Sequence, residues 1–344
     1  MAQLFDRRRF LKTSAGATIG AALIPSAGMA LKKQYPPKGK RIGIIGLDTS
    51  HTAIFSKAFN AADADPRLGG YKVVAACSRG SRDIASALAN VPSVTEDMHK
   101  LNIPVVDTIE ALLPKVDVVL LETNDGRVHL EQAIPVLKSK KPLFIDKPVA
   151  ASLADALAIY ETASRYQTPV FSSSALRFMA NAQEVAKGKV GKVNGADTYS
   201  PATIEKTHPD LYWYGIHGIE ILFTVMGTGC KSVSRMYTPD TDLVAGEWED
   251  QRIGTFRGLR NAGKGRGFGG TVFGEEGIAT VGPFDGYENL LAQIANFFTT
   301  GIPPVSAAET LEICAFIEAA DESKAKGGAP VYIKDVMRKA EKMR

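Results

Sequence analysis

The stretch Lys40–His51, with the sequence KRIGIIGLDTSH, decides the fold of this chain. Its apolar residues predict a buried strand that runs through a glycine turn into a helix. A strand, a glycine turn and a helix in this order open an α/β domain of the dinucleotide-binding type. Gly46 fits the first glycine of the G-x-G-x-x-G pattern, but Asp48 and His51 occupy the second and third glycine positions. The stretch therefore predicts the fold more firmly than the usual cofactor.

The chain continues in the same alternating pattern to about residue 174. Strands are predicted at 41–46, 71–77, 116–122, 143–145 and 169–172, and helices at 51–64, 81–89, 128–139 and 153–166. Strands that alternate with helices predict a parallel sheet with helices on both faces. Residues 38–174 are therefore expected to form a Rossmann-like, doubly wound parallel sheet.

The pattern changes in residues 175–344. Strands are predicted at 197–200, 232–237, 250–256 and 270–273 without a helix between each pair, and helices at 214–226, 287–300 and 310–325. This arrangement predicts an α+β domain on a mainly antiparallel open sheet, which we assign to substrate binding and oligomerisation. The glycine-rich segment 263–270 is expected to be a hairpin loop.

The first 30 residues are expected to be a targeting segment outside the fold. The basic run Arg7–Arg9 with Phe10-Leu11-Lys12, a mild apolar run and small residues at 28–30 resemble a twin-arginine export signal. A membrane anchor or a basic tail is the alternative. The segment predicts a periplasmic protein that is exported by the twin-arginine translocase.

Charge and cysteine content exclude several classes of function. Residues 1–30 hold four of the 41 Lys and Arg and one of the 37 Asp and Glu, so the rest of the chain has a net charge near +1. Such a chain carries no basic surplus for a nucleic-acid partner. The three cysteines are isolated and form no C-x-x-C pair, so no metal or redox motif is predicted from them.

The turn after the first strand is the first candidate cofactor site, with Gly46 and residues 48–51. An acidic side chain at Asp48 about 4 Å from a phosphate is repelled by roughly 1–4 kcal/mol. Asp48, Thr49 and Ser50 are also good helix N-caps, whose oxygens can take the amide groups that a phosphate needs. The alternatives are a capped helix that has lost the dinucleotide, and a dinucleotide held in an adjusted pose that His51 faces.

The ends of the other strands supply further candidates. Ser78 and Arg79 follow the second strand where an NAD site has an acidic residue, and hydroxyl and guanidinium groups there favour NADP over NAD. Carboxyl ends of parallel strands bind ligands in such sheets, so the other predicted cofactor contacts are Thr123, Asn124, His129, Asp146 and Lys147. Lys147 in the crevice can lower the pKa of a substrate hydroxyl or carry its proton.

Together these segments resemble the Gfo/Idh/MocA oxidoreductases. Asp146-Lys147-Pro148 is similar to the Glu-Lys-Pro motif of that family, and His129-Leu-Glu-Gln-Ala is similar to its next helix motif. The segment 214–220, YGIHGIE, resembles the family helix Asp-x-Gly-x-His-x-x-Asp, with Glu220 for the last Asp and Trp213 where the first Asp is expected. The resemblance covers nearly all of residues 40–330.

The resemblance implies hydride transfer between NAD(P) and a hydroxyl of a sugar, polyol or sugar derivative. It implies that Lys147 and His217 are catalytic and that Trp213, Tyr214 and Glu220 bind the substrate. It also implies a homo-oligomer, and for an exported member a tightly bound NADP. No metal is expected, although His217 and Glu220 share a helix face and leave a metal-dependent enzyme as a weaker alternative.

The altered glycine turn and the missing acidic residue at Trp213 support a second interpretation. A member of the family without redox activity, such as a carbohydrate lyase, hydrolase, isomerase or sugar-binding protein, needs no cofactor. The sequence does not decide between the two.

Overall fold

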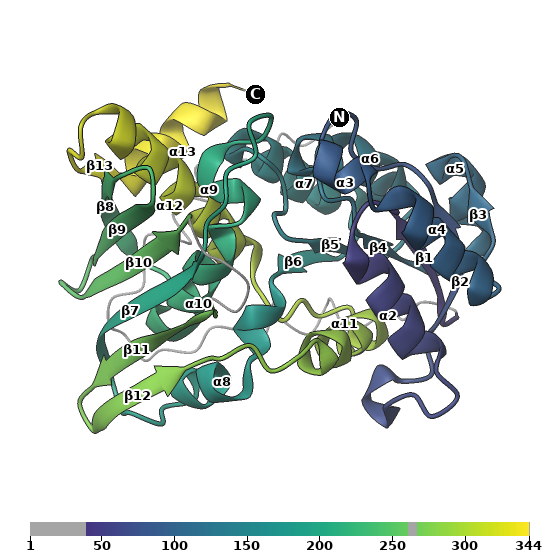
Figure 1. The fold of residues 1–344 in the computed structure, drawn as a ribbon, viewed down its shortest axis with the longest axis horizontal. Coiled ribbons are helices and arrows are strands. Elements are labelled where there is room, and N and C mark those ends of the chain that lie inside the picture. The colour runs from purple at the N-terminus through teal and green to yellow at the C-terminus, as the bar shows by residue number, and fades with distance from the viewer. Residues whose placement is uncertain (1–38, 261–266, 344) are drawn as a thin grey trace, which may run out of the picture. The chain divides into compact units, whose positions relative to one another are not determined.

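The computed structural model describes residues 39–260 and 267–343. Two sheets carry the fold (Figure 1). The first has six strands in the order β3-β2-β1-β4-β5-β6, all parallel. Its strands are β1 (Arg41–Ile45), β2 (Lys72–Cys77), β3 (Val105–Val106), β4 (Val118–Leu121), β5 (Leu143–Asp146) and β6 (Val170–Ser173). The Rossmann-like, doubly wound sheet expected for this half is confirmed, with the order reversal between β1 and β4.

Alternate side chains of these strands point into two apolar cores. Ile42 and Ile44 of β1 pack with α2 (Ser50–Asn60) and α4 (Val91–Lys100), whereas Ile45 belongs to the opposite core. The helices that complete the two faces are α3 (Ala85–Leu88), α5 (Ile109–Leu112), α6 (His129–Lys138) and α7 (Leu153–Tyr166). Helices on both faces shield the side chains on each side of the sheet from water, as is usual for an all-parallel sheet.

Two predicted helices of this half have different limits in the structure. The helix expected over 51–64 ends at Asn60, whose side-chain amide bonds to both backbone groups of Val73 and so ties the chain to β2. The helix expected over 81–89 is only the single turn α3, and Ser81 lies before it, where its backbone N–H and hydroxyl donate to Asp48. The longer helix α4, with a proline in its first turn, was not predicted.

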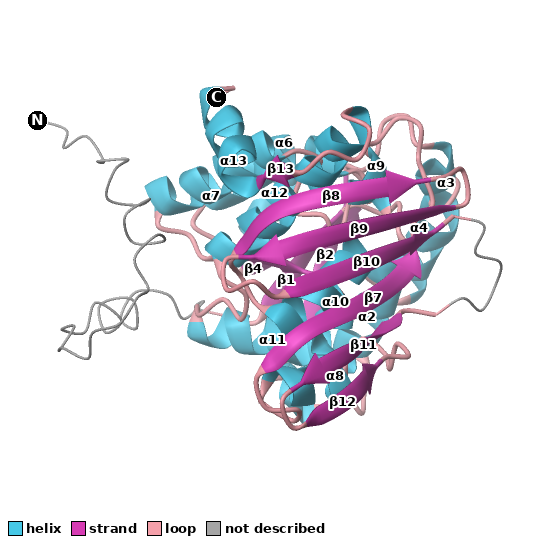
Figure 2. Cartoon of the chain, turned by 90° about the vertical axis from the view of Figure 1, so that its left-hand side faces the viewer, coloured by secondary structure: helices cyan, strands magenta, loops and turns pink. Residues whose placement is uncertain are grey.

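The second sheet has seven strands in the order β12-β11-β7-β10-β9-β8-β13. It is mostly antiparallel, as expected, but β7 and β10 run parallel. Its strands are β7 (Val193–Pro201), β8 (Cys230–Tyr237), β9 (Thr241–Trp248), β10 (Ile253–Leu259), β11 (Gly269–Gly274), β12 (Gly277–Val281) and β13 (Val331–Tyr332). In Figure 2 these strands lie in front of the helices, so the described elements cover one face of the sheet.

The hairpin expected around the glycine-rich segment 263–270 is wrong. The strands on either side, β10 and β11, are not neighbours, because β7 lies between them and pairs with both. The segment therefore does not close a hairpin between neighbouring strands. Its residues 263–266 lie outside the described part, as does the predicted export signal.

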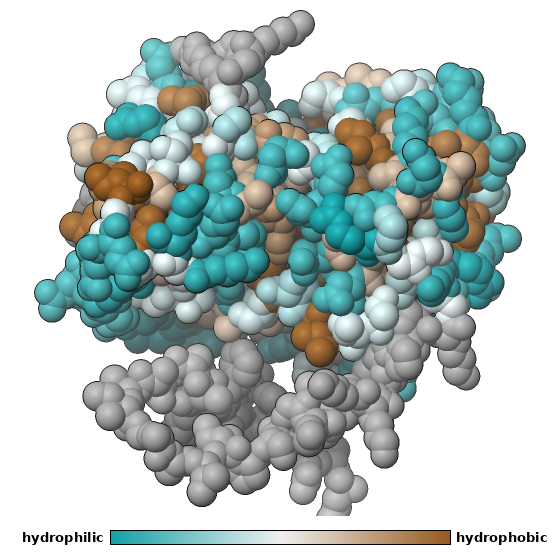
Figure 3. Space-filling model, turned by 90° about the horizontal axis from the view of Figure 1, so that it is seen from below, coloured by the Kyte–Doolittle hydropathy of each residue, from teal (hydrophilic) through white to brown (hydrophobic). Residues whose placement is uncertain are grey.

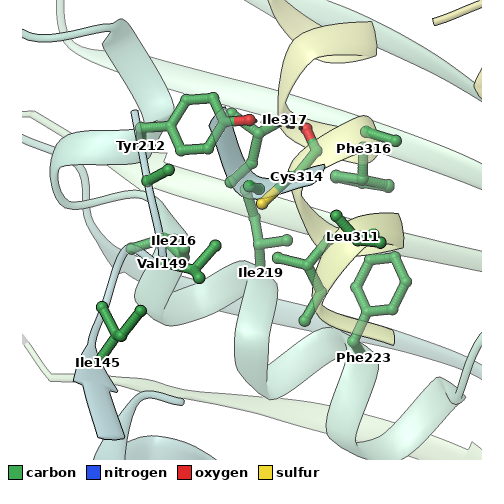
Figure 4. Close-up of a cluster of buried hydrophobic side chains, with 14 of the residues drawn as sticks. Ile145, Val149, Tyr212, Ile216, Ile219, Phe223, Leu311, Cys314, Phe316 and Ile317 are labelled. Atoms are coloured by element: carbon green, nitrogen blue, oxygen red, sulfur yellow. Dashed lines mark hydrogen bonds between the residues drawn. The ribbon is translucent and has the colours of Figure 1, made fainter. Parts of the chain in front are cut away.

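Helices from the second half join the two sheets. They are α8 (Ala180–Ala186), α9 (Asp210–Trp213), α10 (Ile216–Met226), α11 (Glu288–Thr300), α12 (Ala307–Ala325) and α13 (Ile333–Lys342). Although α11 follows the second sheet in sequence, its apolar side chains pack in the same core as α2 and β1. Figure 4 shows α10 and α12 facing each other through Ile219, Phe223 and Leu311, with Ile145 and Val149 beside them. This shared core fixes α10 relative to the end of β5.

The surface shown in Figure 3 has small separate hydrophobic patches among hydrophilic residues. Across residues 39–260 and 267–343, no helix has the length and apolar character that a bilayer crossing requires.

Candidate functional site

The turn after β1 places its glycine against the loop after β4. Gly46 has a φ of +99°, and a Cβ there would lie 2.5 Å from the backbone nitrogen of Thr123. The Gly46 carbonyl accepts a hydrogen bond from Thr52 Oγ1 at 2.8 Å. The glycine is therefore required by the approach of two protein segments, before any ligand is considered.

Asp48 turns its carboxylate into the protein at the carboxyl ends of three strands. The side chain is fully buried and accepts hydrogen bonds from the backbone N–H of Ser81 at 2.8 Å, from the Ser81 hydroxyl, and from the backbone N–H of Asn124 at 3.3 Å. These donors lie in the loops after β2 and β4. In this fold the turn after the first strand holds the phosphates of a dinucleotide through its backbone amides. The donors to Asp48 come from the two neighbouring loops, so Asp48 adds a buried acidic side chain beside that turn.

The first turn of α2 is capped from within the chain. Thr49 is the N-cap, and its Oγ1 accepts from the backbone N–H of His51 at 3.4 Å. Ser50 is exposed. Of the three N-cap candidates in the sequence, Thr49 has this role, and Asp48 instead joins the turn to its neighbouring loops.

The end of β2 offers a separate hollow of about 280 Å³, lined in part by Arg79, Gly80, Ile109, Val128 and Gln132. Ser78 and Arg79 are exposed, and the Arg79 carbonyl accepts from Thr123 Oγ1 at 3.4 Å. Arg79 thus lines an open hollow beside the end of β2.

His51 lies where α2 meets the ends of β4 and β5. Its Nδ1 is 2.6 Å from Asp146 Oδ2 and its Nε2 is 3.0 Å from the Tyr287 hydroxyl, which α11 brings from the second half of the chain. Burial favours a higher pKa for Asp146, but the charge and hydrogen bond of His51, together with Lys147, hold that pKa below its usual range.

Glu122 is buried beside this pair. Its pKa is raised well above the usual value by burial and by the charge of Asp146. Neither of its carboxylate oxygens has a hydrogen-bond partner among the described residues.

Lys147 and His217 meet across the interface between the two sheets. The Nζ of Lys147 lies 5.8 Å from the centre of the Tyr214 ring, and that ring is 5.0 Å from the His217 ring. His217 Nδ1 is 2.8 Å from the hydroxyl oxygen of Ser174, so Nε2 is the nitrogen that can meet a substrate. Burial, and then the charge of Lys147, lower the pKa of His217 well below its usual value, so the imidazole is neutral at pH 7. Burial raises the pKa of Tyr214, which stays protonated.

Aromatic rings continue outward from this point. We call Tyr214, Phe268, Phe284 and Tyr287 the aromatic group. Their ring centres follow one another at 6.5, 6.4 and 5.1 Å. Apolar ring faces next to polar groups are what carbohydrate rings stack on.

Three of the predicted site residues have other partners in the structure. Glu220 is buried, and its Oε1 accepts from Ser173 Oγ at 2.6 Å and from Arg177 Nε at 2.8 Å, so it does not share a ligand position with His217. The His129 ring is fully buried and lies between the carbonyls of Thr123 and Pro148, at 2.7 and 2.9 Å.

Trp213, the third of these residues, is half-buried. Its ring centre lies 5.2 Å from that of His208.

Sequence reasoning missed Glu122, Tyr287, Phe268 and Phe284 as site residues. Glu122 directly follows a buried strand, which is a signal that could have identified it. The three aromatic residues come from segments more than a hundred residues further along the chain, and no local pattern connects them to β4 or β5.

Comparison with known proteins agrees with the fold. Residues 40–174 match the GFO_IDH_MocA family model, described as "Oxidoreductase family, NAD-binding Rossmann fold". No curated protein matches the chain.

Several solved structures are similar to the chain, at low sequence identity. A probable dehydrogenase from Thermotoga maritima is 19% identical, with a TM-score of 0.70 over 86% of this chain and 99% of that one. Scyllo-inositol dehydrogenase from Lactobacillus casei, solved with NAD(H) and scyllo-inositol, is 16% identical, with a TM-score of 0.70 over 86% and 100%. Myo-inositol 2-dehydrogenase from Lactobacillus plantarum is 15% identical, with a TM-score of 0.70 over 86% and 99%.

Proposed function

Because residues 40–174 match the model of the Gfo/Idh/MocA oxidoreductase family, we propose that this protein is an NAD(P)-dependent oxidoreductase. Its substrate would be a sugar, polyol or sugar derivative, oxidised or reduced at a hydroxyl carbon. The observation that carries the proposal is the meeting of Lys147, Tyr214 and His217 at the carboxyl end of β5, beside the aromatic group.

The chain's own groups suit proton transfer at a carbinol. The positive charge of Lys147 stabilises a developing alkoxide, which makes a substrate hydroxyl more acidic. A neutral His217 can accept or return the proton through Nε2, since Nδ1 is held by Ser174. Tyr214 and the other members of the aromatic group would hold the sugar ring. A bound nicotinamide would supply the hydride acceptor or donor.

The dinucleotide fits one part of its expected site and not the other. The hollow at the end of β2 can take the adenosine end, and Arg79, with no acidic residue among residues 78–82, favours NADP. The phosphate turn is closed by the buried Asp48 carboxylate. We propose that Asp48 must leave Ser81 and Asn124 before a dinucleotide binds, and that this requirement lowers the affinity.

The test is to look for the nucleotide directly. The folded protein should release NADP on denaturation, or bind added NADP more tightly than NAD in a calorimeter, and should then turn over a member of a sugar and polyol panel. Absence of both nucleotide signals together with binding of a sugar would contradict the redox proposal.

A second candidate function is favoured by Asp48 itself. Its three hydrogen bonds join the turn to the loops after β2 and β4 without a ligand, which suits a domain that no longer uses a dinucleotide. The protein would then be a carbohydrate lyase, hydrolase, isomerase or binding protein that uses the same strand ends. Turnover of a sugar without change in nicotinamide absorbance would support it.

We also propose export by the twin-arginine route to the periplasm and association into a homo-oligomer. Cys77, Cys230 and Cys314 are free and buried, which suits a protein that folds in a reducing compartment before export. Tyr199, Ile253 and Phe273 are exposed on strands of the second sheet. Cell fractionation of a twin-lysine variant at Arg7 and Arg8, and light scattering of the purified protein, test the two proposals.

A further inference from the structure

Three side chains that can ligate a metal meet at the carboxyl ends of β4 and β5. One ligand atom from each of His51, Glu122 and Asp146 lies within 4.8 Å of the other two. The residues come from the first turn of α2, the residue after β4 and the last residue of β5, which are far apart in sequence. Such spacing lets one ion contact all three at metal–ligand distances of about 2.0–2.6 Å.

Glu122 independently points to a missing partner. The residue has no exposed surface, and both of its carboxylate oxygens lack a hydrogen-bond donor among the described residues. A buried carboxyl group without a partner costs free energy whether it is protonated or ionised, and the ionised form costs several kcal/mol. Other buried carboxylates of this chain are satisfied: Asp48 accepts from Ser81 and Asn124, and Glu220 accepts from Ser173 and Arg177.

We propose that His51, Glu122 and Asp146 bind one divalent metal ion. One imidazole and two carboxylates suit Mn²⁺, Fe²⁺ or Zn²⁺ better than Ca²⁺, which takes six to eight oxygen ligands. When both carboxylates are ionised and His51 is neutral, their two negative charges exceed the single positive charge of Lys147 nearby, and this excess favours a divalent cation. Tyr287 holds the second ring nitrogen of His51 at 3.0 Å, which is the kind of outer contact that orients a ligating histidine.

The ion would have a chemical role beside Lys147. Three protein ligands leave at least one position open for water or a substrate oxygen. An ion there would polarise that oxygen at the same strand ends where Lys147 and His217 meet. The metal site does not rest on a dinucleotide, so it holds for either candidate function.

The competing arrangement is a proton on Glu122 with no metal. Glutamine has the shape of a protonated glutamate, so Glu122→Gln is expected to fold under both arrangements. It removes a charged ligand only in the metal-bound one. The variant therefore separates the two.

The experiment titrates the chelator-treated full chain with Mn²⁺, followed by electron paramagnetic resonance, and with Zn²⁺, followed by calorimetry. We expect one equivalent per chain, and at least about a hundredfold weaker binding in Glu122→Gln, since even outer-shell changes cost 10–100-fold. Glu312→Gln is the matched control, because Glu312 is a carboxylate that accepts from Gly229 and Cys230 away from the three ligands. The control should bind metal as the unaltered chain does.

Two results would overturn the proposal. One is no binding of either ion at about 1 mM. The other is equal affinity in Glu122→Gln and the unaltered chain. If Glu122→Gln fails to fold, Asp146→Asn and His51→Gln are titrated instead, and unchanged affinity in both is again decisive against the site.

Discussion

The turn after β1 and the ends of β4 and β5 lie side by side but differ in how their polar groups are satisfied. At the turn, Asp48 is buried and takes three donors from two loops. At the strand ends, Glu122 is buried without a donor, and Lys147 faces the ring of Tyr214. The first region is complete without a ligand and the second is not. The comparison is consistent with the proposal that chemistry takes place at the strand ends and that the turn no longer binds a phosphate in the usual way.

The largest effect is expected at the strand ends. Lys147→Ala should lower turnover about 10²–10⁴-fold, because it removes the group that we propose handles the hydroxyl proton. Turnover is measured on the carbohydrate of the panel that the unaltered protein converts. Lys115→Ala, at an exposed lysine, is the control. Full activity in Lys147→Ala would place the chemistry elsewhere.

Lowering the pH should destabilise the loop that contains His208, which lies near Asp125 in the segment after β4. Burial lowers the pKa of His208 to about 4, against the weaker effect of its bond to the Pro209 carbonyl and the charge of Asp125. Its Nε2 is buried without a partner, so protonation is unfavourable in the folded state. The neutral His208 side chain contributes fully to the free energy of unfolding above about pH 6.5. This contribution, roughly 3 kcal/mol, is lost as the pH falls toward 4.

The measurement is the free energy of unfolding between pH 7 and pH 4. His208→Gln cannot titrate and should show a flatter profile, whereas His99→Gln, at an exposed histidine, should follow the unaltered protein. Parallel profiles for all three proteins would show that His208 is not responsible.

The phosphate turn is tested by removing its carboxylate. Asp48→Gly should raise dinucleotide affinity roughly ten- to a hundredfold, because the charge that repels the phosphates and the side chain that occupies space beside the turn both disappear. Asp48→Asn removes only the charge and should give a smaller gain. Calorimetry with NADP and NAD measures both variants. No gain in Asp48→Gly would mean that the turn has lost the dinucleotide for reasons beyond this residue.

A smaller effect is expected where α11 supports His51. Tyr287→Phe removes the hydroxyl that faces His51 Nε2 and should lower the free energy of unfolding by about 1 kcal/mol. Denaturant unfolding measures the change, and Tyr332→Phe, at an exposed tyrosine, is the control. An unchanged value for Tyr287→Phe would show that His51 is held by Asp146 alone.

The sequence predicted the parallel sheet because buried strands and amphipathic helices give periodic patterns of apolar residues along the chain. The same patterns placed Asp48 and Lys147 after strands and His217 on a helix. They gave the wrong connection for 263–270, since the insertion of β7 between β10 and β11 is a long-range pairing that no local segment specifies. They also gave α3 too long: Ser81 is tied to Asp48, 33 positions earlier, and the helix begins only at Ala85.

By itself the sequence determined the two-sheet α/β architecture and the glycine turn with an acidic residue in it, because these depend on residues close together in the chain. Only the tertiary structure decided what that residue does. The hydrogen bonds of Asp48 to Ser81 and Asn124, the unpartnered Glu122 beside His51 and Asp146, and the arrival of Tyr287 from α11 are contacts between distant segments. Such contacts follow from how the sheet brings strand ends together, and spacing along the chain does not encode them.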